Sequence, residues 1–294
     1  MKKSYQVSFV LFAALVLSAT AQAEETKVAS ATVFPNSVTA VGTSSSNGET
    51  AGVSSPLDRV YLGLTSTFHG TPVRNMGSEY SVDTTGREKR TTYNMINFDS
   101  EVGAGYRVTK DIGVGPIVPF IAVPVRGQGF ILGDVGLKAF NSKTIDRNGF
   151  RLATNLIVQA PSSDSSKARD MTWALKTTPY GRYQFAHSNV SLGAFTELKD
   201  YFGVSRDKTF KVWALPYLGY SLSDSVTLRL AYEMEWHHNL HQSGLETYMT
   251  DWQPGVVWNI TKQLSINPYV QFYTMNSVDL DHAALGAFLS ASVL

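Results

Sequence analysis

Polar and apolar residues alternate with a period of two along most of the chain after residue 57. Between residues 226 and 237, large apolar side chains take every second position and polar side chains take most of the others: Val226, Leu228, Leu230, Tyr232, Met234 and Trp236 against Thr227, Arg229, Glu233, Glu235 and His237. A β-strand points successive side chains to opposite faces, so this pattern predicts a strand with one apolar and one charged face. The segment 247–260 repeats the pattern.

Similar alternating segments follow one another to the end of the chain, and we count about twelve of them. We expect strands near 58–69, 91–108, 112–125, 130–141, 149–160, 170–186, 189–202, 208–222, 225–239, 247–261, 264–276 and 282–294. These segments are longer than the five or six residues of an average soluble strand. The fold class we predict is therefore all-β, and the strand length favours a transmembrane antiparallel β-barrel over a soluble sandwich.

The connections between these segments carry a second signal. Tight turns at 109–111, 187–188, 223–224 and 261–263 largely alternate with longer connections at 70–90, 161–169, 203–208 and 239–246. Transmembrane barrels have short periplasmic turns, longer outer loops and an even number of strands, so we expect about twelve strands with both termini periplasmic. Two connections fit poorly, because 142–148 is long for a periplasmic turn and 126–129 is short for an outer loop.

Aromatic residues on the apolar faces are candidates for the girdles that mark the two membrane interfaces. They are Trp173, Trp236, Tyr248 and Trp258. Tyr248 and Trp258 share one face of a strand, and along a tilted strand their axial separation is about 25 Å. That separation matches the height of the lipid-facing band of an outer-membrane barrel.

The first residues have the layout of a secretory signal peptide. Lys2 and Lys3 precede an apolar stretch at 7–17, and Ala21-Gln22-Ala23 supplies the small residues of a cleavage site. The stretch is too short to cross a bilayer as a helix, so we expect residues 1–23 to be removed on export. Residues 24–56 lack periodicity and predict a flexible leader, or a segment inserted into a pore. The barrel is expected over residues 57–294.

Composition narrows the classes of protein that remain. Charged residues make up 17% of the chain, against about 25% in a typical soluble domain, as expected when one face of each strand contacts lipid. The chain has no cysteine, which excludes disulfides, thiol catalysis and cysteine-bound metals. A net charge of +1 gives no reason to expect nucleic acid as a partner. We expect no cofactor and no metal site.

Charged residues on the polar faces are expected to point into the barrel, because a charge at the lipid midplane costs about 2–4 kcal/mol. A closed barrel would place them on opposite sides, with a basic wall of Lys138, Arg151, Lys176, Arg182, Lys199 and Lys211 and an acidic wall of Asp99, Glu101, Glu233, Glu235 and Asp251. Either the walls orient polar or charged solutes as they pass, or the charges pair and fill a closed interior.

The chain resembles a Gram-negative outer-membrane β-barrel of about twelve strands, porin-like or transporter-like, over residues 57–294. The stretch Gly133-Asp134-Val135-Gly136-Leu137-Lys138 is similar to a strand of the barrels associated with meta-pathway phenol degradation, and is shorter by one residue. Such barrels often end in Phe, whereas this chain ends in Leu294. The resemblance implies an outer-membrane location, contact with lipid and lipopolysaccharide, insertion by the barrel-assembly machinery and passage of small solutes.

Two functions without transport remain as alternatives: a structural or adhesion barrel, and a lipid hydrolase. His241 and Ser243 are similar to the His-x-Ser of the outer-membrane phospholipase, in which the His activates the Ser. The Asn that orients the His in that family has no counterpart at the expected distance, where this chain has Gly255 and Val256. We therefore expect a protein that is not an enzyme.

Overall fold

The computed structural model describes residues 59–90, 95–125, 129–205, 208–275 and 278–292. The predicted signal peptide at 1–23 and the leader at 24–56 lie outside the described residues, as does the C-terminal Leu294. None of the described helices is long and apolar enough to cross a membrane.

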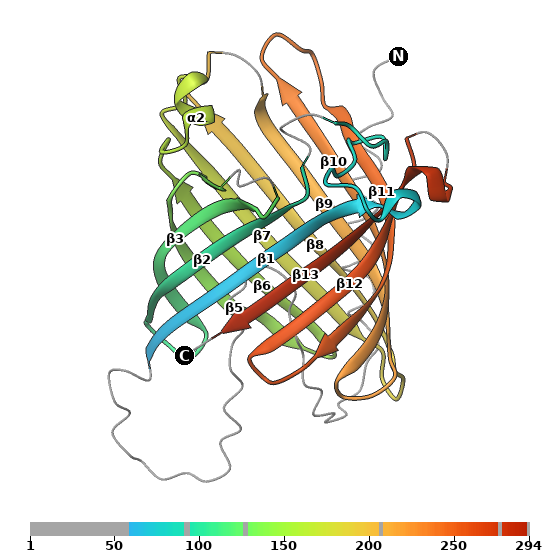
Figure 1. Ribbon diagram of the computed structural model, residues 1–294. Coiled ribbons are helices and arrows are strands. Elements are labelled where there is room, and N and C mark those ends of the chain that lie inside the picture. The colour runs from blue at the N-terminus through green and yellow to red at the C-terminus, as the bar shows by residue number, and fades with distance from the viewer. Residues whose placement is uncertain (1–58, 91–94, 126–128, 206–207, 276–277, 293–294) are drawn as a thin grey trace.

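The described chain is built almost entirely from β-strands, which form one antiparallel sheet (Figure 1). The strands are β1 Val60–Pro72, β2 Asn97–Arg107, β3 Ile112–Val123, β4 Gly129–Leu132, β5 Gly136–Arg147, β6 Phe150–Gln159, β7 Trp173–Gln184, β8 Val190–Phe202, β9 Lys208–Ser221, β10 Val226–Asn239, β11 Glu246–Asn259, β12 Leu264–Tyr273 and β13 Ala283–Ser292. Short helices lie in three connections: η3 Val73–Asn75, α2 Asp164–Ala168 and η5 Leu280–His282.

The sheet closes on itself into a barrel. Strand β1 pairs with β2 on one side, where Gly63 lies opposite Gly103, and with β13 on the other, where Gly63 lies opposite Ser292. The short β4 and the start of β5 pair with successive parts of β3 and share one place in the ring, so the 13 strands form a twelve-position barrel. Apart from the short β4, every described strand is paired on both sides, and such closure is the requirement for a β-structure in lipid. The predicted fold class is confirmed.

The two connections that fitted poorly are explained by the structure. The predicted connection at 142–148 is wrong, because β5 continues to Arg147 after a register irregularity between Asn141 and Ile145. The turn that follows is Asn148-Gly149, with positive φ at both residues (51° and 76°), which is the backbone of a two-residue hairpin. The second poorly fitting connection was the short outer loop expected at 126–129. The connection between β3 and β5 is longer than this, because the short β4 belongs to it.

Tight turns therefore gather at one end of the barrel, which we call the turn end. They span residues 108–111, 148–149, 185–189, 222–225 and 260–263. The other connections, including those that carry α2 and η3, gather at the opposite end, which we call the loop end (Figure 1). Strand β1 begins and β13 finishes at the turn end.

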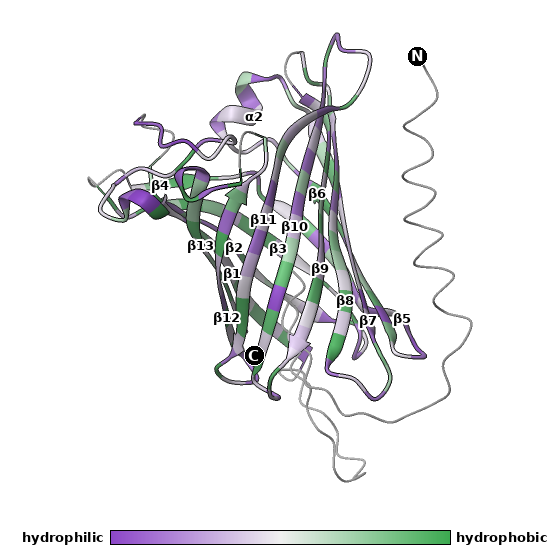
Figure 2. Ribbon diagram, turned by 90° about the vertical axis from the view of Figure 1, so that its right-hand side faces the viewer, coloured by the Kyte–Doolittle hydropathy of each residue, from purple (hydrophilic) through white to green (hydrophobic). Residues whose placement is uncertain are grey.

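The two faces of the barrel wall differ in polarity, as the alternating sequence predicts. On β6, Leu156 and Val158 are 50% and 47% exposed, whereas Asn155 and Gln159 are buried. Figure 2 shows hydrophilic and hydrophobic positions interleaved along the strands. Other exposed apolar side chains lie on strands around the ring: Val118, Leu137, Leu192, Leu218, Leu228, Leu230, Trp252 and Trp258. An apolar surface of this extent on a monomer calls for a lipid or protein contact.

The interior of the barrel is packed by aromatic rings that lie across glycines. A Cβ on Gly193 would lie 2.5 Å from the ring of Tyr217, so only glycine leaves room for that ring. Tyr217 belongs to a buried cluster with Tyr180, Phe195 and Leu215, and the hydroxyls of Tyr180 and Tyr217 lie 2.6 Å apart. This cluster fills part of the lumen near the middle of β7, β8 and β9.

Candidate functional site

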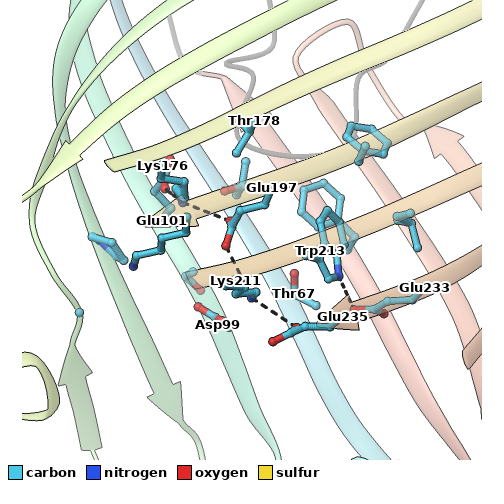
Figure 3. A pocket seen from close by; sticks show the side chains of 18 of the residues that line it. Thr67, Asp99, Glu101, Lys176, Thr178, Glu197, Lys211, Trp213, Glu233 and Glu235 are labelled. Atoms are coloured by element: carbon cyan, nitrogen blue, oxygen red, sulfur yellow. Dashed lines mark hydrogen bonds and ion pairs between the residues drawn. The ribbon is translucent and has the colours of Figure 1, made fainter. Parts of the chain in front are cut away.

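A cavity of about 600 Å³ occupies the lumen. Its lining comes from both sides of the barrel and from the connection that carries α2, and it includes Tyr180 and Phe195 of the aromatic cluster. The charged side chains of the lining are Asp99, Glu101, Asp134, Arg169, Lys176, Glu197, Lys199, Lys211, Arg229, Glu233 and Glu235, several of which Figure 3 shows. The interior surface is therefore strongly polar.

Lysines and glutamates of this lining form a chain of ion pairs. Lys138 Nζ on β5 lies 2.9 Å from Glu101 Oε1 on β2, and Lys176 Nζ on β7 lies 3.9 Å from Glu101 Oε2. Lys176 Nζ also lies 3.6 Å from Glu197 Oε2 on β8. All of these side chains are at most 21% exposed, so each charge relies on its partners to offset the loss of hydration.

The chain of ion pairs continues across the next two strands, β9 and β10. Lys211 Nζ on β9 lies 3.5 Å from Glu197 Oε1 and 3.3 Å from Glu235 Oε2 on β10 (Figure 3). Glu235 also contacts the imidazole Nε2 of His237, and that nitrogen lies 3.3 Å from Lys208 Nζ. We name the six residues Lys138, Glu101, Lys176, Glu197, Lys211 and Glu235 the lumen ion-pair chain.

Strand register explains why the charges alternate along this chain. Lys176 lies opposite Lys199, and Lys199 lies opposite Lys211, so three cations occupy one row across β7, β8 and β9. Like charges directly opposite each other destabilise a sheet. Glu197, two residues before Lys199 on the same inner face, places its carboxylate within reach of both flanking lysines.

Two further acidic residues, Glu233 and Asp251, are held by neutral donors. Glu233 lies opposite Asp251 in the register of β10 and β11. Trp213 Nε1 donates to Glu233 at 2.5 Å, Gln253 Nε2 donates to Asp251 at 3.0 Å and to Glu233, and Gln271 Nε2 donates to Asp251 at 2.9 Å. These hydrogen bonds satisfy carboxylate oxygens that would otherwise be buried without partners.

The structure places the predicted wall residues on the inner face and brings the two groups together. Of the basic residues, Lys138, Lys176 and Lys211 pair with glutamates, as the pairing interpretation describes. Arg151 lies 3.2 Å from Asp146, and Arg182 donates to Gln184 at 2.8 Å, both toward the turn end. Two oppositely charged walls that orient solutes stay a prediction.

The predicted girdle residues divide into two groups. Trp173 stacks on Phe202 at the loop end, with ring centroids 3.8 Å apart, and Trp258 is 52% exposed at the turn end. Trp236 lies on the outward-facing side of β10 and is half-buried. Tyr248 is 47% exposed, but a register irregularity between β10 and β11 interrupts the alternation there, and its ring stacks on the lumen residue His237 at 4.2 Å, so its girdle role stays a prediction. A bulge of this kind re-aims one side chain.

The cavity residue Arg169 and its neighbour Tyr201 had no role in the sequence analysis, and Asp134 appeared there only in the family motif. Asp134 Oδ1 accepts from the backbone N–H of Ser163 at 3.0 Å, and its Oδ2 accepts from Ser166 Oγ at 2.5 Å. These bonds tie the α2 connection to the barrel interior. Arg169 and Tyr201 complete this region, and nothing in the local pattern marked them, because a loop residue and a strand residue meet there only in the folded barrel.

The long connection at 70–90 folds onto the rim at the loop end. Arg74 pairs with Asp281 of the η5 connection, and Asn75 Nδ2 donates to Glu88 at 2.8 Å. Partial burial opposes ionisation of Asp83, but hydrogen bonds from Thr85 and from the backbone of Arg87 outweigh it and hold the pKa of Asp83 below its usual range. Contact of this segment with lipopolysaccharide stays a prediction.

The candidate hydrolase pair lies at the surface. His241 and Ser243 are both exposed in the turn between β10 and β11, and His241 has a positive φ of 74°. Both are described residues, and no hydrogen bond joins them there. A nucleophile and its activating base need such a contact or a close approach to it.

Comparison with known proteins identifies the fold. No family model matches the chain, and neither does any curated protein sequence. Among solved structures, an outer membrane channel from Pseudomonas putida F1 aligns with a TM-score of 0.50 and 12% identity, covering 80% of this chain and 96% of that one. The NanC porin aligns with a TM-score of 0.43 and 8% identity, covering 79% and 99%. The chain shares a barrel fold with the first of these proteins.

Proposed function

We propose that this protein is an outer-membrane channel for the passive passage of small polar or charged solutes. The observation that carries the proposal is the polarity of the two faces of one closed wall. Apolar side chains cover the outside, and a charged cavity of about 600 Å³ lies inside. Lipid outside and water-soluble ligands inside are the partners that such a wall matches.

The similarity to an outer membrane channel supports this proposal at the level of architecture. We infer that the turn end faces the periplasm, because barrels of this class have their short turns there. With β1 beginning and β13 finishing at that end, both termini are then periplasmic. Export through the signal peptide at 1–23, insertion by the barrel-assembly machinery and contact with lipopolysaccharide belong to the same proposal.

Single-channel recording in planar lipid bilayers tests the proposal. Purified, refolded protein should produce discrete conductance steps, and vesicles that contain it should swell in small neutral, anionic or cationic solutes. Charge reversal at Lys176 should shift ion selectivity if the lumen ion-pair chain lines the path. A refolded barrel without conductance steps above the background of empty bilayers would contradict the channel function.

A barrel without transport is the second candidate, and the buried aromatic cluster around Tyr180 and Tyr217 favours it. Here the ion pairs and rings serve only to stabilise the interior. The same recording separates the two functions. For the hydrolase, equal rates of phospholipid hydrolysis in mixed micelles by the wild type and by Ser243→Ala would exclude a role for that residue.

A further inference from the structure

Two cations lie against one aromatic ring at the loop end of the cavity. The ring belongs to Tyr201, near the end of β8, and it is buried. Lys199 Nζ lies 4.8 Å from its centroid, and the guanidinium carbon of Arg169 lies 5.2 Å from it. Lys199 comes from the barrel wall and Arg169 from the connection just after α2, and both line the cavity.

These two cations differ from those of the lumen ion-pair chain. Within the described part of the chain, no carboxylate oxygen lies within 4.0 Å of Lys199 Nζ or of the Arg169 guanidinium. Among the described residues, Arg169 donates to Ser165 O at 3.3 Å and to Ser166 Oγ at 3.5 Å, both neutral. Lys199 also has Lys176 and Lys211 as its direct neighbours across the sheet. The positive charge of Arg169 and Lys199 is thus less compensated than the lysine charges of the lumen ion-pair chain.

Polar contacts on both sides of Arg169 hold its segment against the barrel. Ser166 is 1% exposed and donates to Asp134, which is 8% exposed and also accepts from the backbone of Ser163. On the other side of Arg169, Asp170 accepts from Ser205 Oγ at 2.5 Å. A cation held on a rigid support loses little conformational freedom when it binds a ligand.

We propose that Arg169 and Lys199 form a binding subsite for the anionic group of a small solute, a carboxylate or a phosphate, at the loop-end mouth of the lumen. Arginine offers a planar fork of N–H donors that matches both groups, and lysine adds a second charge. Tyr201 supplies an apolar face beside them. The inference rests on the proposed channel function and makes its preferred solutes anionic.

The carboxylates near this position are already engaged by other groups, beginning with Asp134, which accepts from Ser163 and Ser166. Glu197 is already shared by Lys176 and Lys211, and Glu233 and Asp251 are held by neutral donors. Asp99, on β2, is the exposed carboxylate of the cavity and has no ion pair among the described residues. It therefore disfavours anions on its own side of the lumen and leaves the Arg169 side to attract them.

Two measurements test the subsite, and one of them does not depend on conduction. Ligand-observed NMR of the detergent-solubilised barrel measures binding of glucuronate, inorganic phosphate and uncharged glucose. Arg169→Gln and Lys199→Gln should each weaken binding of the anions by about tenfold, because each removes a charge-assisted contact. The exposed Lys143→Gln on β5 is the matched control and should bind as the wild type does. Reversal potentials in a KCl gradient should shift toward cations in the first two variants only.

The outcomes separate this inference from the channel function. Anion binding without conductance would refute the channel and keep the subsite. Conductance with wild-type anion binding in both Gln variants would refute the subsite and keep the channel. The subsite would also be refuted if the wild type bound glucuronate and phosphate no better than glucose. Arg169→Lys and Lys199→Arg keep the charge and should restore most binding, which separates loss of the site from loss of folding.

Discussion

Removal of the Glu197 carboxylate offers the sharpest test of the lumen ion-pair chain. Glu197 lies 3.6 Å from Lys176 and 3.5 Å from Lys211, and its side chain is 21% exposed. In Glu197→Gln, the row of Lys176, Lys199 and Lys211 loses its shared counter-charge while the shape of the side chain is kept. The variant therefore isolates the electrostatic contribution of one carboxylate.

The size of the effect follows from these distances. At an effective dielectric constant of about 20, each contact contributes about 4–5 kcal/mol of Coulomb energy. Partial hydration of the partners reduces this figure, and breaking a buried pair by removing one member costs about 3–5 kcal/mol. We expect Glu197→Gln to lower the free energy of unfolding by about 2–4 kcal/mol, since the side chains remain partly exposed.

Urea unfolding in lipid vesicles, followed by tryptophan fluorescence, measures this free energy. The control is Glu246→Gln, which neutralises an exposed glutamate on β11 and should change stability by less than about 0.5 kcal/mol. In bilayers, the conductance of Glu197→Gln should also become more anion-selective. If Glu197→Gln is as stable as the control, the carboxylate does not offset the lysine charges and the pairing argument is refuted.

Three further predictions concern other parts of the molecule. Gly193→Val should destabilise the barrel by about 1–3 kcal/mol in the same urea assay, because the added side chain overlaps the ring of Tyr217, and an unchanged midpoint would contradict that packing. Asp99→Asn removes an unpaired carboxylate from the cavity, so reversal potentials should shift toward anions, and a shift toward cations would contradict its placement. The lowered pKa of Asp83 stabilises its turn when the carboxyl is ionised, so that stabilisation is present above the unfolded pKa and is lost as the pH falls through the folded pKa. Pepsin, which is active at acid pH, should therefore cleave within 78–90 faster as the pH falls in the wild type, whereas Asp83→Asn lacks the carboxylate and should show no such pH dependence.

The alternating pattern predicted the strands well because alternation is local. The segment expected at 225–239 is the strand Val226–Asn239, and the one expected at 208–222 is Lys208–Ser221. The error at 142–148 arose where the polar stretch of β5 masked its continuation, although Asn148-Gly149 carries a strong hairpin signal. The contact of Tyr248 with His237 did not follow from the pattern, because one extra residue on β11 interrupts the alternation and a period-two pattern does not reveal it.

The sequence predicted which charged residues face the lumen but not which of them are in contact. Inward charges such as Lys176 and Glu101 followed from the cost of charge in lipid. Their contact did not, since β2 and β7 are far apart in the chain and meet only when the sheet closes. The same holds for Arg169 and Tyr201, because the connection that carries Arg169 is held against the barrel by the hydrogen bonds of Ser163 and Ser166 to Asp134.

By itself the sequence determined the all-β class, the long strands, the apolar outer face and the set of charges that point inward, because each depends on residue type and a two-residue period. Only the tertiary structure decided which charges neutralise each other and which remain available. Ring closure and strand register set those distances, and they pair Lys211 with two glutamates while leaving Lys199 beside an aromatic ring. Local alternation carries no information about register between strands, so the electrostatics of the lumen emerge only from the closed barrel.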